Sequence, residues 1–135
     1  MLYLDTSALV KLVLVETHSA DLAAWLDGRV QMRWVTSVLA DVELPRAVIR
    51  AGSPEGLASV PAVLARLDRF EIDEVVRTTA ASLRDPDLRT LDAIHLATAT
   101  VAASTANLDA VVTYDRRLAS VVSSLGMRPV APGVT

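Results

Sequence analysis

The sequence opens with Met1-Leu2-Tyr3-Leu4-Asp5-Thr6-Ser7-Ala8-Leu9-Val10-Lys11-Leu12. Its apolar start predicts a short β-strand over Leu2–Asp5, and Thr6 or Ser7 can then cap a helix that we expect to run to Val15. A strand that passes directly into a helix is the repeating unit of α/β proteins. Asp5 stands at the junction, where the strand ends.

The rest of the chain continues this alternation of strands and helices. We expect further strands at residues 30–36, 110–113 and 128–130, a brief buried strand at 70–72, and helices at 18–27, 37–50, 54–67, 73–83, 90–105 and 115–125. Pro45 should disturb the helix at 37–50, because proline lacks the backbone N–H that a helix uses. The alternation implies an α/β fold in which helices cover both faces of a mostly parallel central sheet. The length of 135 residues suits a single domain over residues 1–135.

Composition excludes several classes of protein. The chain contains no cysteine, which excludes disulfides, thiolate metal sites and a cysteine nucleophile. Although 52% of the residues are hydrophobic, Lys11 and His95 interrupt the longest apolar stretches, so we expect no membrane-spanning segment. The start lacks the basic region and apolar run of a signal peptide, and we expect a cytoplasmic protein. A net charge of −3 argues mildly against a passive nucleic-acid binder, but not against a nuclease that gathers acids around bound cations.

Four acidic residues lie where predicted elements begin or end, or close to such a point. Asp5 closes the first strand and Asp115 follows the strand at 110–113, while Glu43 lies in one helix and Asp92 opens another. Ligands of parallel sheets bind outside the carboxyl ends of the strands, so Asp5 and Asp115 fall at the edge where a site is expected. Clustered carboxylates need a neutralising cation, and an all-oxygen ligand set favours a hard divalent ion such as Mg²⁺.

Each acid also has a purely local interpretation. Asp5, Asp92 and Asp115 lie near helix starts, where a carboxylate is a common cap or first-turn residue. Glu43 could form a surface ion pair with Arg46, three residues later on the same helix. These interpretations do not explain why all four acids border the same predicted edge of the sheet.

Four stretches of sequence carry a resemblance to a known family. They are Leu2–Leu12, Ser37–Glu43, Leu91–Ala97 and Val111–Leu118. In order and spacing they resemble the motifs of PIN-domain ribonucleases, and of the VapC toxin branch in particular, over essentially the whole chain. The resemblance implies a three-layer α/β/α PIN-like fold, dependence on Mg²⁺ or Mn²⁺, and endonucleolytic cleavage of structured RNA such as tRNA or rRNA. It also implies a homodimer and inhibition by a cognate VapB-type antitoxin of a type II toxin-antitoxin pair.

The resemblance assigns roles to individual acids. Asp5, Glu43 and Asp92 match the three core acids of the family, and Asp115 matches a more variable fourth. Phosphodiester hydrolysis by a metal-activated water needs a divalent ion to acidify the water and to polarise the phosphate. We therefore expect Asp5 and Asp92 to be direct ligands and Glu43 to be a ligand or a water-orienting base. Asp115 would complete a second or substrate-dependent ion position.

Supporting residues surround these acids. Thr6 and Thr113 match hydroxyl positions beside the family's site. Two pairs of arginines that follow acids in the sequence are candidate contacts to RNA phosphates, or else ordinary surface residues: Arg46, Arg50, Arg116 and Arg117. His95 lies one turn after Asp92, but its apolar neighbours favour a packed, hydrogen-bonded histidine over a catalytic one. Pro45 departs from the uninterrupted helix that the family has after its glutamate.

Three other classes of protein compete with this interpretation. A response-regulator receiver needs a lysine on a late strand, and the only lysine here is Lys11, on the first helix. A phosphatase of the haloacid-dehalogenase type needs a second aspartate two residues after the first, where this chain has Ser7. A non-catalytic PIN-like domain that only binds RNA or protein would have lost core acids, and all of them are present.

Overall fold

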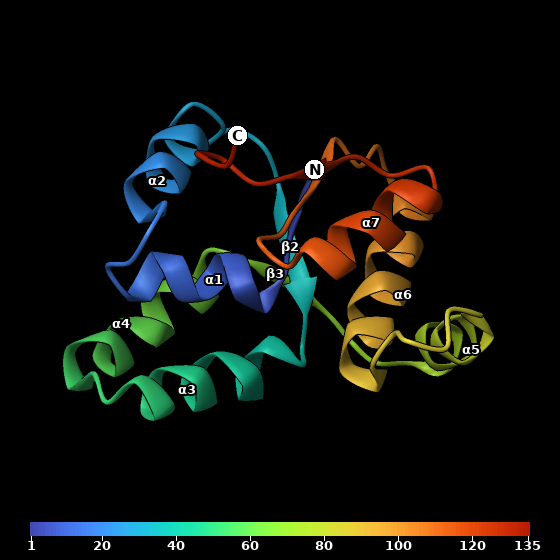
Figure 1. The fold of residues 1–135 in the computed structure, drawn as a ribbon, viewed down its shortest axis with the longest axis horizontal. Coiled ribbons are helices and arrows are strands. Elements are labelled where there is room, and N and C mark those ends of the chain that lie inside the picture. Colours follow the sequence, from blue (N-terminus) through green and yellow to red (C-terminus); the bar gives the residue numbers. More distant parts are fainter.

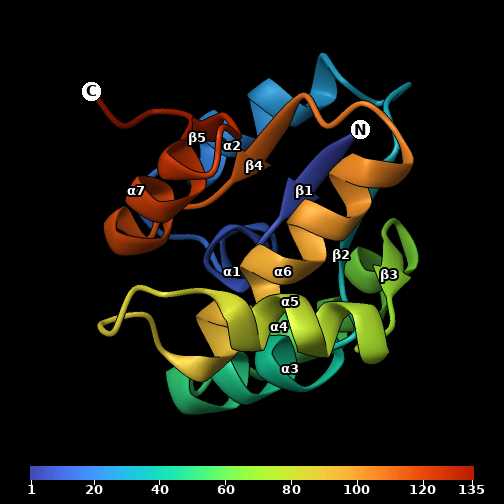
Figure 2. The same ribbon diagram turned by 90° about the vertical axis from the view of Figure 1, so that its right-hand side faces the viewer.

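A parallel five-stranded sheet forms the centre of the molecule, and helices cover both of its faces (Figures 1 and 2). The structure is a computed structural model that describes all 135 residues. In chain order the elements are β1 (Leu2–Leu4), α1 (Thr6–Val13), α2 (Ser19–Asp27), β2 (Trp34–Ser37), α3 (Ala40–Ala51), α4 (Pro54–Ala65), β3 (Asp68–Phe70), α5 (Glu74–Ser82), α6 (Thr90–Thr105), β4 (Ala110–Val112), α7 (Arg116–Ser124) and β5 (Pro129–Val130). The strands lie in the order β3-β2-β1-β4-β5, which places β1 in the middle of the sheet.

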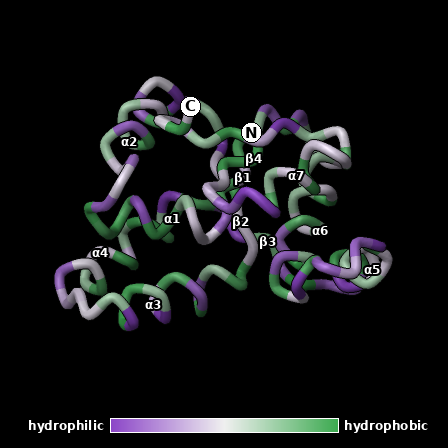
Figure 3. The backbone as a smooth tube through the Cα atoms, in the orientation of Figure 1, coloured by the Kyte–Doolittle hydropathy of each residue, from purple (hydrophilic) through white to green (hydrophobic).

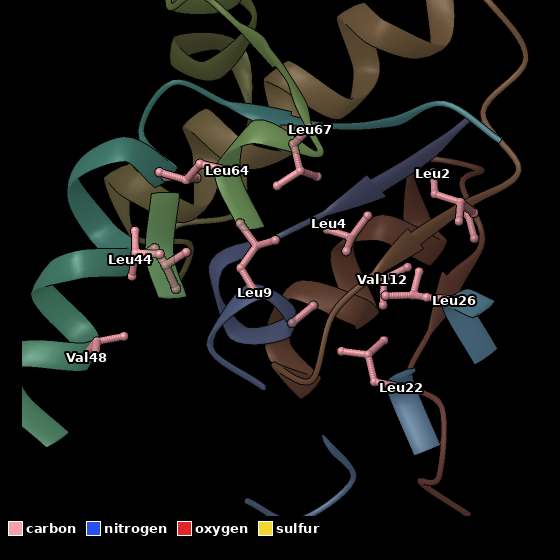
Figure 4. Packing of buried hydrophobic residues seen from close by; sticks show 14 residues of the cluster. Leu2, Leu4, Leu9, Leu22, Leu26, Leu44, Val48, Leu64, Leu67 and Val112 are labelled. Carbon is pink, nitrogen blue, oxygen red and sulfur yellow. The ribbon is translucent and has the colours of Figure 1, made fainter. Parts of the chain in front are cut away.

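The central strand supplies residues to two separate hydrophobic cores. Successive residues of a strand point to opposite faces of the sheet. Leu2 and Leu4 therefore pack in one core with residues of α1, α2, α3 and α4 (Figure 4). Tyr3 packs in the other core with residues of α6 and α7. The predicted three-layer α/β/α architecture is confirmed.

The central strand β1 and its neighbour β4 consist of hydrophobic residues, because a parallel sheet that is covered on both faces has no solvent-facing side. Every residue of β1 and of β4 is buried. Figure 3 shows these apolar strands between helices of mixed hydropathy. None of the helices combines the length and the apolar character that crossing a membrane requires.

Two predicted strands were wrong in their bounds, and pairing register explains both errors. β2 begins at Trp34 rather than at residue 30, because Trp34 pairs with Leu2 at the start of β1 and earlier residues have no partner strand. β3 covers Asp68–Phe70 rather than 70–72, because Phe70 pairs with Ser37, the last residue of β2. β3 is also an edge strand with exposed residues, so the prediction that it is buried was wrong as well.

The helix that carries Glu43 is continuous, so the predicted disturbance at Pro45 was wrong. Helix α3 runs without a break from Ala40 to Ala51. Pro45 lies in the second turn, and the carbonyl that its missing N–H would have bonded belongs to Asp41, which is exposed to solvent. Ser37, the predicted cap, lies in β2 and accepts a hydrogen bond from the N–H of Leu39 in the turn before α3.

Candidate active site

Asp5 lies at the carboxyl end of the central strand and caps the helix that follows. Its Oδ1 accepts hydrogen bonds from the Ala8 N–H at 3.0 Å and from the Ser7 hydroxyl at 2.6 Å. Its Oδ2 accepts one from the Thr113 hydroxyl. The residue is only 3% exposed, and burial raises the pKa of its carboxyl, a shift that these three hydrogen bonds only partly oppose. All three donors are neutral, so a cation beside Asp5 would favour its charged form.

Glu43 reaches the same region from helix α3. Its Oε1 accepts hydrogen bonds from the Thr6 hydroxyl at 2.7 Å and from Nε2 of His95 at 2.6 Å. Burial raises the pKa of Glu43, but the hydrogen bonds from His95 and Thr6 outweigh it and hold the pKa below its ordinary value. Glu43 is therefore ionised at neutral pH. Because both donors use Oε1, the oxygen Oε2 is left for a cation or a water molecule.

His95 connects Glu43 to the second hydrophobic core. It is 4% exposed, and its Nδ1 lies 2.7 Å from the hydroxyl of Tyr3. The Glu43 carboxylate can only accept, so Nε2–H donates to it. Burial raises the pKa of Tyr3, so its phenol stays protonated and its O–H can donate a hydrogen bond to Nδ1. The predicted packed and hydrogen-bonded histidine is confirmed. Its partner, however, is one of the candidate site acids.

Asp92 and Asp115 lie together beside Arg89. Asp92 is in the first turn of α6, and its Oδ2 accepts a hydrogen bond from Nε of Arg89 at 3.2 Å. Asp115 caps α7 by accepting the N–H groups of Arg117 and Leu118 at Oδ1. Its other oxygen, Oδ2, lies 3.9 Å from Nη2 of Arg89.

Threonine hydroxyls connect several of these acids to one another or to neighbouring elements. The Thr113 hydroxyl that donates to Asp5 also accepts the N–H of Asp115 at 3.1 Å. Thr6, the residue after Asp5, donates to Glu43. The two hydroxyl residues expected beside the site therefore both contact acids of the predicted set.

The donor set fits a divalent cation of the Mg²⁺ type. No three of the His, Asp and Glu side chains lie close enough together to form a ready-made metal cage. Mg²⁺ does not require one, since it keeps several waters and binds through one or two carboxylates. The buried Asp5 carboxylate, which has only neutral donors, and the ionised Glu43, which has a free oxygen, are ligands of that kind.

A polar groove of about 600 Å³ opens beside Asp92. Its lining combines three acids, Asp85, Asp87 and Asp92, with three arginines, Arg89, Arg116 and Arg117, and guanidinium groups are suited to binding phosphates. Two of the four predicted phosphate contacts, Arg116 and Arg117, therefore line the groove beside Asp92. The other two, Arg46 and Arg50, are exposed on α3 and do not line it.

Sequence reasoning missed three residues that the structure places in the site. Ser7 binds Asp5 and also accepts the N–H of Tyr114, and Tyr3 orients His95. Arg89 contacts two of the acids. Arg89 could have been noticed in the sequence, because it lies directly before a predicted helix, at a position where Ser, Thr, Asp or Asn is preferred.

Comparisons with known proteins identify the family of this chain. The PIN domain family matches residues 2–123. The chain is 62% identical over 133 residues to a protein of Mycobacterium tuberculosis named Ribonuclease VapC35, with 98% of each chain covered. It is 39% identical to Ribonuclease VapC47 and 40% identical to Ribonuclease VapC46 of the same species, with 98% and 97% of each chain covered, respectively. The chain therefore belongs to the PIN-domain family, as a VapC-type member.

Proposed function

We propose that this chain is a Mg²⁺- or Mn²⁺-dependent endoribonuclease, the toxin of a VapBC-type toxin-antitoxin pair, which cleaves structured RNA such as tRNA or rRNA in the cytoplasm. The observation that carries the proposal is the buried Asp5 carboxylate at the carboxyl end of β1, which has only neutral donors and shares the Thr113 hydroxyl with Asp115. The groove lined with arginines beside Asp92 supports an RNA substrate. The names of the M. tuberculosis relatives, all ribonucleases, support the activity.

Each residue of the proposed site can have a separate role in phosphodiester hydrolysis. A bound divalent ion would supply an acidified water and would neutralise charge on the phosphate. Asp5 and Asp92 would hold this ion, and Asp115 would complete a second position. Glu43 can accept a proton from the attacking water at Oε2, while its Oε1 is fixed by Thr6 and His95.

Arg116 and Arg117 can hold the phosphates that flank the cleaved bond, because both line the groove. The hydrolysis joins the water oxygen to phosphorus and breaks one bond from phosphorus to a ribose oxygen.

Removal of divalent metal is expected to stop cleavage completely. The test incubates the purified chain with total tRNA and rRNA and maps the new RNA ends by sequencing. Specific ends should appear with Mg²⁺ or Mn²⁺, disappear in EDTA, and return when Mg²⁺ is restored in excess. Binding of RNA without metal-dependent cleavage would instead support a non-catalytic PIN-like domain.

We also propose that the chain forms a homodimer and binds a small VapB-type antitoxin. Several large apolar side chains are exposed on α3, α5 and α6, namely Val42, Ile49, Val75 and Leu91, and they support a further interface. An apolar groove of about 280 Å³ between α1, β2 and α4 supports the docking of an apolar antitoxin segment. It is lined by Leu12, Trp34, Ala62, Val63, Arg66 and Leu67.

Light scattering is expected to give twice the chain mass for the protein alone. Adding the antitoxin should give a larger complex and should abolish cleavage. A chain that stays monomeric at tens of micromolar, roughly the range in which a stable interface is populated, would contradict the dimer. Undiminished cleavage in a saturated complex would contradict the inhibitory role of the antitoxin.

A further inference from the structure

Arg89 occupies a position that helix stability does not explain. It is the N-cap residue of α6 and makes no side-chain capping hydrogen bond. The N-terminus of a helix carries partial positive charge, so a cation there is unfavourable. Serine, threonine, aspartate or asparagine would stabilise this helix start better than arginine does. Capping therefore does not explain the position of this guanidinium.

The guanidinium instead contacts two acids of the candidate site. Its Nε lies 3.2 Å from Oδ2 of Asp92, and its Nη2 lies 3.9 Å from Oδ2 of Asp115. Asp115 uses Oδ1 to cap α7, so Oδ2 is its only oxygen free for a cation. Arg89 thus faces the oxygens that a divalent ion would need from these two residues.

The same side chain also lines the substrate groove. Arg89 is 72% exposed and shares the groove with Arg116 and Arg117. Neither of those two residues forms an ion pair with a carboxylate. Arg89 is therefore the one arginine of the groove that can exchange carboxylate partners for a phosphate.

We propose that Arg89 is an exchangeable cation that couples metal binding to RNA binding. Without metal it neutralises Asp92 and Asp115. When a divalent ion takes those oxygens, Arg89 is released and pairs with an RNA phosphate in the groove, for which its planar guanidinium is equally suited. Bound metal should then strengthen RNA binding, and bound RNA should strengthen metal binding to the same degree. The proposal rests on the proposed nuclease function.

The proposal predicts effects of opposite sign from one substitution. Arg89→Gln removes the competitor of the metal, so Mn²⁺ should bind about two- to fivefold more tightly, the range expected for losing exposed ion pairs. The same change removes a phosphate contact, so the KM for RNA should rise about three- to tenfold, with a smaller change in kcat. Arg117→Gln is the matched control, because it removes a groove arginine that has no carboxylate partner. It should raise KM while leaving Mn²⁺ affinity unchanged.

The experiment titrates each purified variant with Mn²⁺ and measures free ion by electron paramagnetic resonance without RNA. Cleavage of a fluorophore–quencher RNA hairpin at saturating Mn²⁺ then gives KM and kcat, and circular dichroism verifies folding. Unchanged or weaker Mn²⁺ binding by Arg89→Gln would overturn the proposal, as would equal tightening in Arg117→Gln. Either result would leave the proposed nuclease function intact, provided that the wild-type chain binds Mn²⁺ and cleaves RNA. A wild-type chain that neither binds Mn²⁺ nor cleaves RNA would overturn both.

Discussion

Asp5→Asn is expected to reduce RNA cleavage by about 10²- to 10⁴-fold, because it removes the buried charge that would hold the metal and so forfeits several kcal/mol of transition-state stabilisation. The substitution is well matched to the site. Asparagine caps helices as well as aspartate does, and its oxygen can still accept the N–H of Ala8. In the wild type the Thr113 hydroxyl donates to Asp5, whereas in the variant it can accept a hydrogen bond from the asparagine NH₂ group. Lost cleavage would then report on charge rather than on folding.

The same variant is expected to be more stable than the wild type in EDTA at neutral pH. Burial raises the pKa of Asp5 in the folded protein above the ordinary value of about 3.9 in the unfolded chain. Stability is therefore lost as the pH rises through the folded-state pKa, and asparagine avoids this loss. Melting temperatures measured between pH 4 and pH 8 should diverge as the pH rises and converge toward pH 4. Full Mg²⁺-dependent activity of Asp5→Asn would refute its assignment as a metal ligand.

His95→Leu is expected to reduce cleavage by about 10- to 100-fold, the usual effect of removing a group that orients a metal ligand or catalytic carboxylate. It frees Oε1 of Glu43 from one of its two donors and removes the Nδ1 atom that pairs with the buried Tyr3 hydroxyl. Because Thr36 and Thr98 remain beside that hydroxyl, the loss of this one buried hydrogen bond should lower the free energy of unfolding by about 1 kcal/mol. Urea denaturation measures the second effect, and initial rates of RNA cleavage measure the first.

Two companion variants separate orientation of Glu43 from simple packing. His95→Gln keeps an N–H donor for Glu43 and should retain more activity than His95→Leu at similar stability. Tyr3→Phe removes only the donor to Nδ1, and combining it with His95→Leu should cost less stability than the sum of the single changes, because the two residues share one hydrogen bond. Equal activity of the Leu and Gln variants would show that Glu43 does not depend on this donor.

The sequence predicted residues whose position follows from local pattern. Asp5 and Asp115 come directly after apolar strands, so their place at the carboxyl edge of the sheet followed from the strand prediction. The contact between Glu43 and His95 joins residues 52 positions apart on different helices, and no local pattern predicts how two helices face each other. Arg89 was missed for a related reason, since its two carboxylate partners lie on separate elements.

The errors in strand bounds have a similar origin. Residues 30–33 have strand-like composition, but a strand needs a neighbour to pair with, and β1 offers none before Leu2. Asp68 and Arg69 lack that composition and still form a strand, because β2 presents free backbone groups to them. Composition describes what a residue favours, whereas pairing depends on where other strands begin and end.

The use of β1 by both cores has a consequence for how proteins of this architecture can diversify. Enlarging Leu4 would disturb the layer of α1 to α4, and enlarging Tyr3 would disturb the layer of α6 and α7. Asp5 follows Leu4 directly, so its backbone position is constrained by the packing of both cores. The exposed surfaces of the outer helices carry no such double constraint. New partner specificities can evolve there while the position of Asp5 stays fixed.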